Sequence, residues 1–295
     1  MKQNHILLVD GMALLFRAFF ATSVHGNFMY NSKGLPTNGV SGLLKHLTLA
    51  INSFQPSHVI CCWDMGSSTF RNESFQNYKA NRSEPPVELL PQFDMAKEAV
   101  SALEIPNIGI RGYEADDCIG TLALSYHGDM KVTILTGDRD LLQLLTDNIE
   151  VALLQKGMGN YKIYSEQTFT EETGIHPLGL IDVKGLMGDA SDNYPGVKGI
   201  GEKTAYKLIA QYKSIEVLLD SLAELTKGQR TKIENDLEML TLSRSLARIN
   251  CEVPLECVLE DAELSFDPHH TMNRLGELDI KGFRKLPEHS NSEAM

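Results

Sequence analysis

Carboxylate side chains that could hold a metal ion follow three apolar segments of the sequence, directly after each segment ends. These β-branched runs are typical of buried strands, and open parallel α/β sheets bind their ligands at the carboxyl ends of the strands. We therefore expect these carboxylates to meet at one edge of a sheet. The residues are Asp10 after 6–9, Asp64 after 58–63, and Asp138 and Asp140 after 131–135.

A second acidic group lies at the start of a helix that the sequence predicts over residues 117–126. It consists of Glu114, Asp116 and Asp117. So many carboxylates cannot share a site as bare ions, because like charges close together cause protonation or separation. A divalent cation would offset this charge, and oxygen ligands without His or Cys indicate Mg²⁺ or Mn²⁺ instead of zinc.

Each acidic group also has an ordinary structural explanation. The second group could be the acidic first turn of a helix whose apolar stripe faces the core. Asp138 could cap the helix that carries residues 141–145. Taken singly, the two explanations carry similar weight. The repetition favours a shared site, because helix capping does not require an aspartate after every apolar strand.

Residues 70–82 form a polar segment in which cations alternate with aromatic rings. Lys79 and Arg82 are three residues apart and would share one face of a helix. The composition suits a nucleic-acid backbone with stacked bases, although a solvated arm explains the segment almost equally well. The cations are Arg71, Lys79 and Arg82, and the rings are Phe70, Phe75 and Tyr78.

Arg17, which precedes Phe19 and Phe20, could contact nucleic acid in a similar way. The alternative places both phenylalanines in the core and Arg17 in solvent, and it is the simpler of the two interpretations.

The segment 188–205 reads GDASDNYPGVKGIGEKTA and combines an acidic motif with a glycine-rich one. Asp189 and Asp192 could present two carboxylates together, or they could be ordinary turn formers. The glycines at 196, 199 and 201 permit positive φ and close approach of a ligand to backbone N–H groups. The next helix should bury residues 205, 208, 209 and 212, and its free start beside Lys203 would bind phosphate.

The same segment differs from the nucleotide-binding loops that it resembles locally. Glu202 stands where a P-loop has Lys, and no strand precedes the loop; Thr204 stands where the GxGxxG motif needs its last glycine. A hairpin between two helices that grips a DNA backbone without reading its sequence fits better.

Composition and length set further bounds. The chain has 295 residues, of which 42% are hydrophobic, and this suits a soluble protein with two domains or one α/β domain with an appendage. The apolar runs are too short to span a bilayer, and the first residues lack a signal-peptide layout. The five cysteines contain no CxxC motif, so we expect reduced thiols in a cytoplasmic protein.

The net charge of −12 would ordinarily argue against a nucleic-acid partner. Nine of the acidic residues, however, belong to the predicted metal site, and without them the balance falls to −3. A basic face elsewhere on the protein is therefore compatible with the composition.

With these motifs in order, the chain resembles the 5′ nuclease (flap endonuclease) superfamily and is similar to the stand-alone bacterial 5′-3′ exonucleases. The resemblance covers nearly the whole chain. It rests on the motifs LLVDG, CWD, FRxxxFxxYKANR, YEADD, TGDRDLLQL and GDxSDNxPGVxGIGxKTA.

The resemblance implies a PIN-like or resolvase-like α/β fold with a mainly parallel sheet over residues 1–168. It also implies a helical DNA-binding region over residues 169–295, with a helix-hairpin-helix motif at about 188–212. The tail, residues 288–295, is polar and is predicted to be frayed.

The resemblance also assigns roles to individual residues. Lys79 and Arg82 would lie on a helical arch or gateway over the site and contact the scissile phosphate, and with Asp10, Asp64, Asp116 and Asp138 they would be the catalytic residues. Arg17, Arg71 and Tyr78 are the further predicted nucleic-acid contacts. The hairpin, through Lys198, Gly199, Gly201, Lys203 and Thr204, would bind duplex DNA, with a K⁺ ion ordering the loop. Two Mg²⁺ or Mn²⁺ ions are expected: the first on Asp10, Asp64, Glu114, Asp116 and Asp117, the second on Asp138, Asp140, Asp189 and Asp192.

The expected activity is metal-dependent hydrolysis of DNA near 5′ ends, flaps or RNA-primer junctions, by a cytoplasmic monomer that acts with a separate DNA polymerase. Three other functions were weighed. A PIN-type ribonuclease would not need the hairpin, and a haloacid-dehalogenase-like phosphatase would need an aspartate where Met12 stands. A non-enzymatic DNA-binding module would leave nine carboxylates as a cost to DNA affinity.

Overall fold

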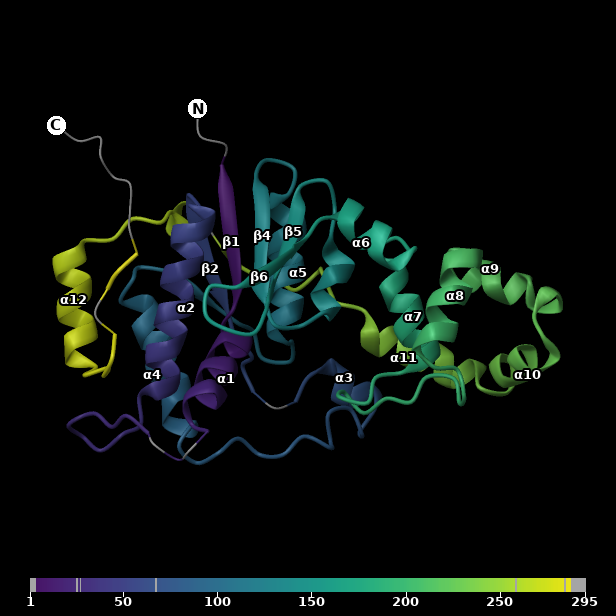
Figure 1. Ribbon diagram of the computed structural model, residues 1–295, viewed down its shortest axis with the longest axis horizontal. Coiled ribbons are helices and arrows are strands. Elements are labelled where there is room, and N and C mark those ends of the chain that lie inside the picture. The colour runs from purple at the N-terminus through teal and green to yellow at the C-terminus, as the bar shows by residue number, and fades with distance from the viewer. Residues whose placement is uncertain are drawn as a thin grey trace.

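The computed structural model describes residues 4–24, 26, 28–66, 68–257, 259–283 and 285–287. The tail that the sequence predicts to be frayed lies outside the described residues. A sheet with helices on both faces forms one part of the molecule, and a group of helices extends from it at one end (Figure 1). None of the helices that the structure describes combines the length and the apolar character that a membrane crossing requires.

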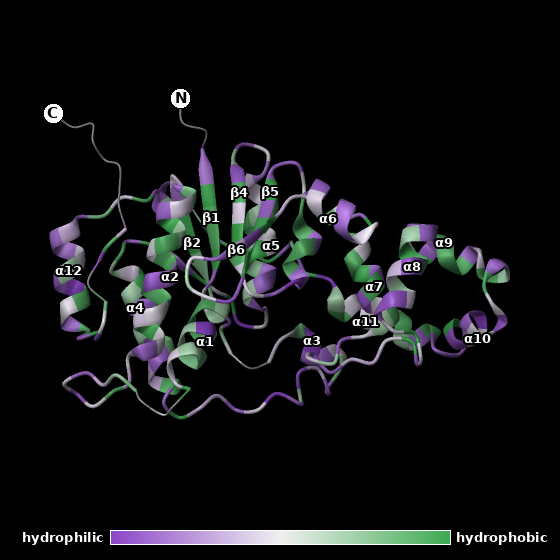
Figure 2. Ribbon diagram, viewed as in Figure 1, coloured by the Kyte–Doolittle hydropathy of each residue, from purple (hydrophilic) through white to green (hydrophobic). Residues whose placement is uncertain are grey.

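The sheet has the strand order β3-β2-β1-β4-β5-β6, and all neighbours are parallel except β5 and β6. Its central strands are buried on both faces and are therefore continuous apolar runs, which confirms the predicted mainly parallel sheet. Hydropathy follows this pattern, with β1 largely hydrophobic along its length (Figure 2). The strands are β1 His5–Asp10, β2 His58–Cys62, β3 Asn107–Ile108, β4 Lys131–Thr136, β5 Ile149–Leu154 and β6 Tyr161–Tyr164.

Helices cover the two faces of the sheet. Leu7 and Val9 pack with the apolar sides of α1, α2 and α4, whereas Ile6 and Leu8 pack with α5. The helices are α1 Gly11–Thr22, α2 Asn38–Phe54, α3 Phe70–Ser74, α4 Leu90–Ser101, α5 Ala115–Tyr126, α6 Glu166–Thr173, α7 Gly179–Met187, α8 Glu202–Tyr212, α9 Ile215–Asp220, α10 Lys227–Asn235, α11 Leu237–Ala247 and α12 Pro268–Glu277, with short 3₁₀ helices at Asp140–Leu144, Leu222–Glu224 and Leu259–Ala262.

The core on the α5 face continues into the helical part of the chain, through buried side chains of α7, α8 and α11. The boundary predicted between residues 168 and 169 falls inside α6. That helix ends at Gly174, which has a left-handed φ of 75°, so we place a proposed boundary there, where a helix has ended.

The C-terminal segment corrects one expectation. Residues 259–287 were assigned to the helical DNA-binding region, but Leu264, Phe266 and Leu275 pack in the core on the α1 face of the sheet. The backbone N–H of Leu264 donates to the carbonyl of Ser57 at 2.8 Å. Helix α12 consequently lies at the end of the molecule opposite to α8–α10 (Figure 1). Burial of these apolar side chains outweighs their sequence distance from the sheet.

Candidate active site

A cavity of about 540 Å³ opens at the carboxyl ends of the parallel strands, where the sequence predicts the site. Acidic side chains from β1, β2, β4 and α5 line it together with two cations. The lining residues are Asp10, Met12, Ala13, Phe16, Asp64, Lys79, Arg82, Glu114, Ala115, Asp116, Gly137 and Asp138.

Asp10 is held between two strands and a helix. One of its carboxylate oxygens accepts from the backbone N–H of Ala13 at 2.8 Å, and the other accepts from the hydroxyl of Thr136 at 2.7 Å. Asp10 is therefore the N-terminal cap of α1, and it also lines the cavity. Capping and membership of the site are both true of this residue. Burial raises the pKa of Asp10, these two hydrogen bonds lower it, and the nearby charges of Asp64 and Asp138 raise it, with a net pKa of about 6.

The start of α5 is fixed to the end of β2. A carboxylate oxygen of Asp64 accepts from the backbone N–H of Ala115 at 2.7 Å. Burial raises the pKa of Asp116 well above its usual range, and the charges of Asp138, Asp10 and Glu114 act in the same direction. These mutual effects show that carboxylates far apart in sequence lie close together at this edge of the sheet.

Another cluster of carboxylates, from Asp140 and Asp189, surrounds Lys184 of α7. The sequence analysis did not identify Lys184 as a site residue. The Nζ atom of Lys184 lies 2.5 Å from Oδ1 of Asp140 and also pairs with Asp189. Burial raises the pKa of Asp140 to about 6 despite Lys184. Burial acts in the same direction on Asp189, but hydrogen bonds from Lys184 and Ser191 lower its pKa to about 2. The available signal was Lys184 itself, the one basic residue of a helix that is mainly apolar.

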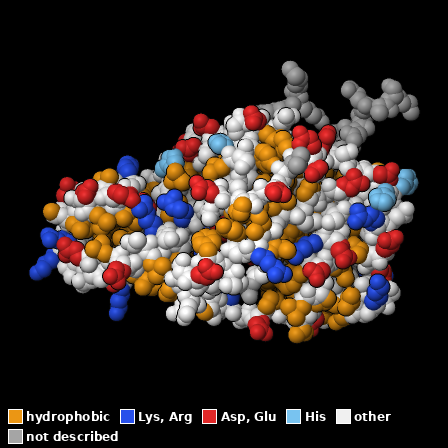
Figure 3. Space-filling model, turned by 180° about the vertical axis from the view of Figure 1, so that it is seen from behind, with side chains coloured by type: hydrophobic (Ala, Val, Ile, Leu, Met, Phe, Trp, Pro, Cys, Tyr) orange, Lys and Arg blue, Asp and Glu red, His pale blue; other side chains and the backbone are white. Residues whose placement is uncertain are grey.

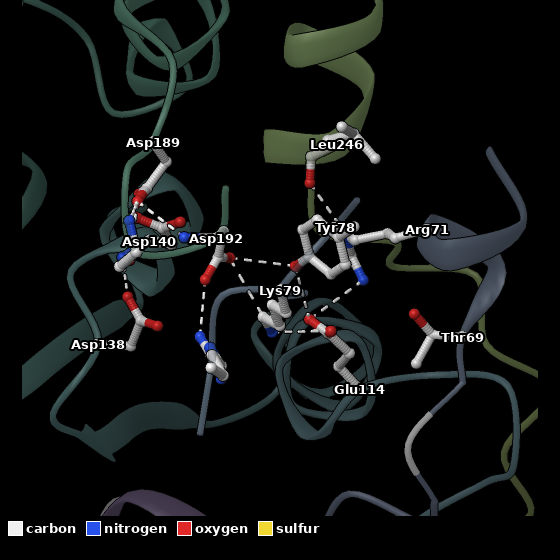
Figure 4. Close-up of polar contacts among 12 residues, drawn as sticks. Thr69, Arg71, Tyr78, Lys79, Glu114, Asp138, Asp140, Asp189, Asp192 and Leu246 are labelled. Atoms are coloured by element: carbon white, nitrogen blue, oxygen red, sulfur yellow. Dashed lines mark hydrogen bonds and ion pairs between the residues drawn. The ribbon is translucent and has the colours of Figure 1, made fainter. Parts of the chain in front are cut away.

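Lys79 lies between Glu114, which lines the cavity, and Asp192 (Figure 4). Lys79 Nζ lies 2.8 Å from Glu114 and 3.9 Å from Asp192, and Arg82 lies 2.6 Å from Asp192. The hydroxyl of Tyr78 is within hydrogen-bonding distance of Glu114 (3.2 Å) and Asp192 (3.1 Å). Two cations therefore stand over the carboxylates that line the cavity, which we call the acidic rim. A phosphate group in the cavity would meet both cations.

The oxygen-only donor set suits a hard divalent cation, and the raised pKa values of Asp10 and Asp116 show the electrostatic cost that such a cation would offset. Asp10, Asp64, Glu114, Asp116 and Asp138 share the cavity and fit that role. Within the described part of the chain, no three His, Cys, Asp or Glu side chains are grouped closely enough to hold a metal as they stand. Lys79, Arg82 and Lys184 pair with Glu114, Asp192, Asp140 and Asp189 instead.

The structure corrects the assignment of Asp117 as a metal ligand. Its side chain is fully buried, and both oxygens are used: Arg71 donates to each at 2.8 Å, Asn250 N–H to one at 2.8 Å and Glu114 N–H to the other at 3.0 Å. Neighbouring residues on a helix point about 100° apart, so Asp116 faces the cavity while Asp117 faces the interior.

The predictions that Arg71 and Tyr78 contact nucleic acid are also wrong. Arg71 is 3% exposed and its guanidinium is enclosed by Asp117 and the carbonyls of Leu246 and Arg248. Tyr78 is equally buried, and its ring stacks on Tyr194. Neither side chain presents a surface to a phosphate or a base.

The segment that carries Lys79 differs from the predicted helical arch. Helix α3 ends at Ser74, and Lys79 has a φ of 55°, so Lys79 and Arg82 do not share a helical face. The backbone N–H of Lys79 instead donates to the carbonyl of Asp192 at 2.9 Å. This contact places both cations at the cavity without a helix.

The glycine-rich hairpin is stabilised largely by its own chain. Gly196 and Gly199 have φ angles of 62° and 79°, whereas Gly201 does not use a positive φ. The backbone N–H of Lys198 donates to Asp236 at 2.7 Å, and Lys232 donates to the carbonyl of Gly199 at 2.8 Å. Consequently the N–H group of Lys198 is not free for a ligand, contrary to expectation.

Other predicted hairpin features agree with the structure. The buried side of α8 consists of Ala205, Leu208, Ile209 and Tyr212, as predicted. Lys198, Gly199, Gly201 and Lys203 are exposed, and Thr204 is half-buried. Lys and Arg side chains project from the end of the molecule that α8–α10 form, among acidic ones (Figure 3). Arg17 is half-buried and donates to the carbonyl of Gln155, while Phe19 is buried and Phe20 exposed.

Comparison with known proteins finds similarity over nearly the whole chain. Residues 5–174 match the model of a 5′-3′ exonuclease N-terminal resolvase-like domain, and residues 175–269 match a 5′-3′ exonuclease C-terminal SAM fold. The chain is 62% identical over 292 residues to the 5′-3′ exonuclease of Bacillus subtilis, covering 99% of both chains. It is 38% identical over 295 residues to DNA polymerase I of Bacillus caldotenax, of which it spans 33%.

Solved structures agree on the fold. A phage T5 5′-exonuclease with bound zinc superposes with a TM-score of 0.68 at 23% identity, covering 93% of this chain and 98% of that one. A phage T5 flap endonuclease in complex with DNA and metal ions gives 0.70 at 23% identity, covering 93% and 99%.

Proposed function

The chain belongs to the 5′-3′ exonuclease family, and from this premise we propose that it hydrolyses DNA phosphodiesters near 5′ ends and at 5′ flaps with divalent metal. One observation carries the proposal. Asp10, Asp64, Asp116 and Asp138 line a single cavity at the strand ends, and Lys79 stands over it. Grouped carboxylates suit divalent cations, and cations facing them suit a phosphate.

The carboxylates of Asp10, Asp64, Glu114, Asp116 and Asp138 would hold the metal, as Mg²⁺ or Mn²⁺. When bound, such ions polarise a phosphoryl oxygen and lower the pKa of a water molecule that attacks it. The residues of the acidic rim then serve as ligands and not as general bases. Asp140, Asp189 and Asp192 would support a second ion, and Lys184 already supplies positive charge beside Asp140 and Asp189.

Lys79 and Arg82 have the complementary role toward the substrate. Each is paired with a carboxylate, Lys79 with Glu114 and Arg82 with Asp192. A scissile phosphate entering the cavity would accept hydrogen bonds from both side chains, which would stabilise negative charge on its oxygens in the transition state. The carboxylates keep the two cations oriented before the phosphate arrives.

The helical region would hold the duplex. The exposed side chains of Lys198 and Lys203 flank the hairpin, and contacts with the phosphate backbone bind DNA without reading its sequence. We include in the proposal a K⁺ ion at this hairpin, RNA-primer junctions among the substrates, a separate DNA polymerase as partner, and action as a cytoplasmic monomer.

The test compares cleavage of a labelled 5′-flapped DNA, a structured RNA and a small phosphomonoester, each with Mg²⁺, Mn²⁺ or EDTA. Divalent-dependent release of short 5′ products from the flap supports the proposal. Cleavage of RNA alone would favour a PIN-type ribonuclease, hydrolysis of the monoester alone a phosphatase, and DNA binding without cleavage a non-enzymatic module.

A further inference from the structure

Arg71 joins three segments of the chain that are far apart in sequence. It lies on α3, and its guanidinium donates two parallel hydrogen bonds of 2.8 Å to Asp117 on α5. Its remaining N–H groups reach the carbonyl oxygens of Leu246 at 3.0 Å and Arg248 at 2.8 Å, at the end of α11. These contacts leave Arg71 only 3% exposed, so its task is structural and it has no surface to offer a substrate.

The same guanidinium touches the acidic rim. One of its nitrogens lies 3.4 Å from Glu114, which lines the cavity and pairs with Lys79 at 2.8 Å. Glu114 is the N-terminal cap residue of α5, and its own backbone N–H donates to Asp117. The orientation of Glu114 is therefore set by Arg71 from one side and by Asp117 from the other.

A buried ion pair of this kind is weak support for stability by itself, because removing two charges from water offsets much of their attraction. A planar guanidinium that makes a two-pronged contact does, however, fix geometry. Asp116, which faces the cavity, follows Glu114 on the first turn of α5 and precedes Asp117. Holding Asp117 thus sets the direction in which Asp116 and Glu114 point.

We propose that Arg71 is a positioning residue: through Asp117 and Glu114 it fixes the first turn of α5 against the segment that presents Lys79. The inference rests on the proposed function, because it concerns the geometry of that site. Arg71 also contacts the end of α11. The helical region is therefore in direct contact with the guanidinium that holds the acidic rim in place.

The experiment compares Arg71→Met, Arg71→Lys and the double variant Arg71→Met with Asp117→Asn. The matched control is Arg244→Met. Arg244 also pairs with a buried aspartate, Asp182 at 2.6 Å, but between α7 and α11, away from the cavity lining. Three quantities are measured: the single-turnover cleavage rate of flapped DNA, the Kd for that DNA in EDTA, and the thermal midpoint with and without Mn²⁺.

Arg71→Met should slow single-turnover cleavage about 100-fold, because a small displacement of catalytic groups has that effect, while the Kd in EDTA stays unchanged. Arg71→Lys keeps the positive charge but loses the two-pronged contact of the guanidinium. Its cleavage rate should lie between those of wild type and Arg71→Met. The double variant leaves no unpaired buried charge, so it should recover stability without recovering rate. Arg244→Met should lose stability and keep the wild-type rate.

A wild-type rate in folded Arg71→Met or Arg71→Lys would overturn the inference. So would a weaker Kd with a normal rate at saturating DNA, because that is the behaviour of a phosphate contact. If Arg71→Met does not fold, Arg71→Lys and the double variant decide in its place. If wild type cleaves no DNA, the proposed function fails separately. The Mn²⁺-induced rise in thermal midpoint then tests the positioning role, and it should be lost in Arg71→Met and kept in Arg244→Met.

Discussion

The Nζ atom of Lys184 lies 2.5 Å from Oδ1 of Asp140, so a lysine from α7 is built into the acidic group that follows β4. Its side chain is only 14% exposed and also pairs with Asp189. A fixed positive charge therefore neutralises part of the negative charge of this cluster of carboxylates. The sequence analysis expected metal ions alone to neutralise it.

Replacing Lys184 with Met should move the pH dependence of cleavage to higher pH. Burial and Asp138 raise the pKa of Asp140, and Lys184 lowers it, so that the net pKa is about 6. Without Lys184 the carboxyl should stay protonated at still higher pH. Single-turnover rates from pH 6 to 9 measure this shift, with Lys131→Met, which loses a half-buried pair with Glu150, as the control. An unchanged profile would contradict the prediction.

The metal-free protein should lose stability as the pH rises from about 4 to about 7, in part through Asp10. Because burial raises the pKa of Asp10 from 3.8 to about 6, the folded state retains a proton that the unfolded state releases. This contribution is present below pH 3.8 and is lost as the pH passes 6. Asp10→Asn should therefore stabilise the metal-free protein at pH 7 by up to about 3 kcal/mol, as urea unfolding in EDTA can show.

Asp189→Asn provides the comparison of opposite sign. The pKa of Asp189 is lowered to about 2, so its contribution to stability is present above pH 3.8 and is lost as the pH falls through 2. The variant should be less stable than wild type at pH 7. Stabilisation by both substitutions, or by neither, would mean that the two acidic groups do not differ as the structure indicates.

Asp116→Asn or Asp138→Asn should abolish cleavage and leave DNA binding in EDTA intact. Both side chains line the cavity and neither contacts the hairpin, so their loss removes metal ligands and no duplex contact. Cleavage assays and fluorescence anisotropy measure the two quantities. Asp117→Asn, in contrast, should reduce stability and slow cleavage without abolishing it, since Asp117 is buried against Arg71 and binds no metal. Near-normal turnover of Asp116→Asn would contradict the assignment of Asp116 as a metal ligand.

Lys79→Ala should slow the chemical step far more than it weakens DNA binding. The ammonium group lies over the acidic rim beside Glu114, where it would meet the transition-state charge of the phosphate. Single-turnover rates at saturating enzyme separate the two effects. Lys162→Ala, which loses an exposed pair between Lys162 of β6 and Glu172 of α6, is the control. A fall in affinity with a normal rate would instead make Lys79 a binding residue.

Two glycines of the hairpin should respond differently to alanine. Gly196 has a φ of 62°, and a Cβ there would collide with the backbone of Gly188, so Gly196→Ala should destabilise the protein by about 1 kcal/mol or more. Gly201 has a φ of −97°, and among the described residues no atom outside Gly201 and its chain neighbours lies within 4 Å of its Cβ position. Gly201→Ala should leave the thermal midpoint unchanged and weaken binding of duplex DNA, and full affinity would remove Gly201 from the proposed DNA contacts.

The sequence was sufficient to predict the sheet and the location of the site. Apolar runs define β1, β2 and β4, and the carboxyl ends of parallel strands share one edge, so the convergence of Asp10, Asp64 and Asp138 follows from local pattern alone. The apolar side of α8 was predictable for the same reason, because its period is local.

The partners of charged side chains could be determined only from the tertiary structure. Asp116 and Asp117 are chemically identical neighbours, yet one lines the cavity and the other is buried against Arg71. Likewise, Lys184 lies in the acidic group, and Lys79 reaches the cavity from a left-handed turn. Spacing along the chain predicts which face of an element a residue occupies. The partner that meets that face depends on how distant segments pack, and no local pattern contains that information.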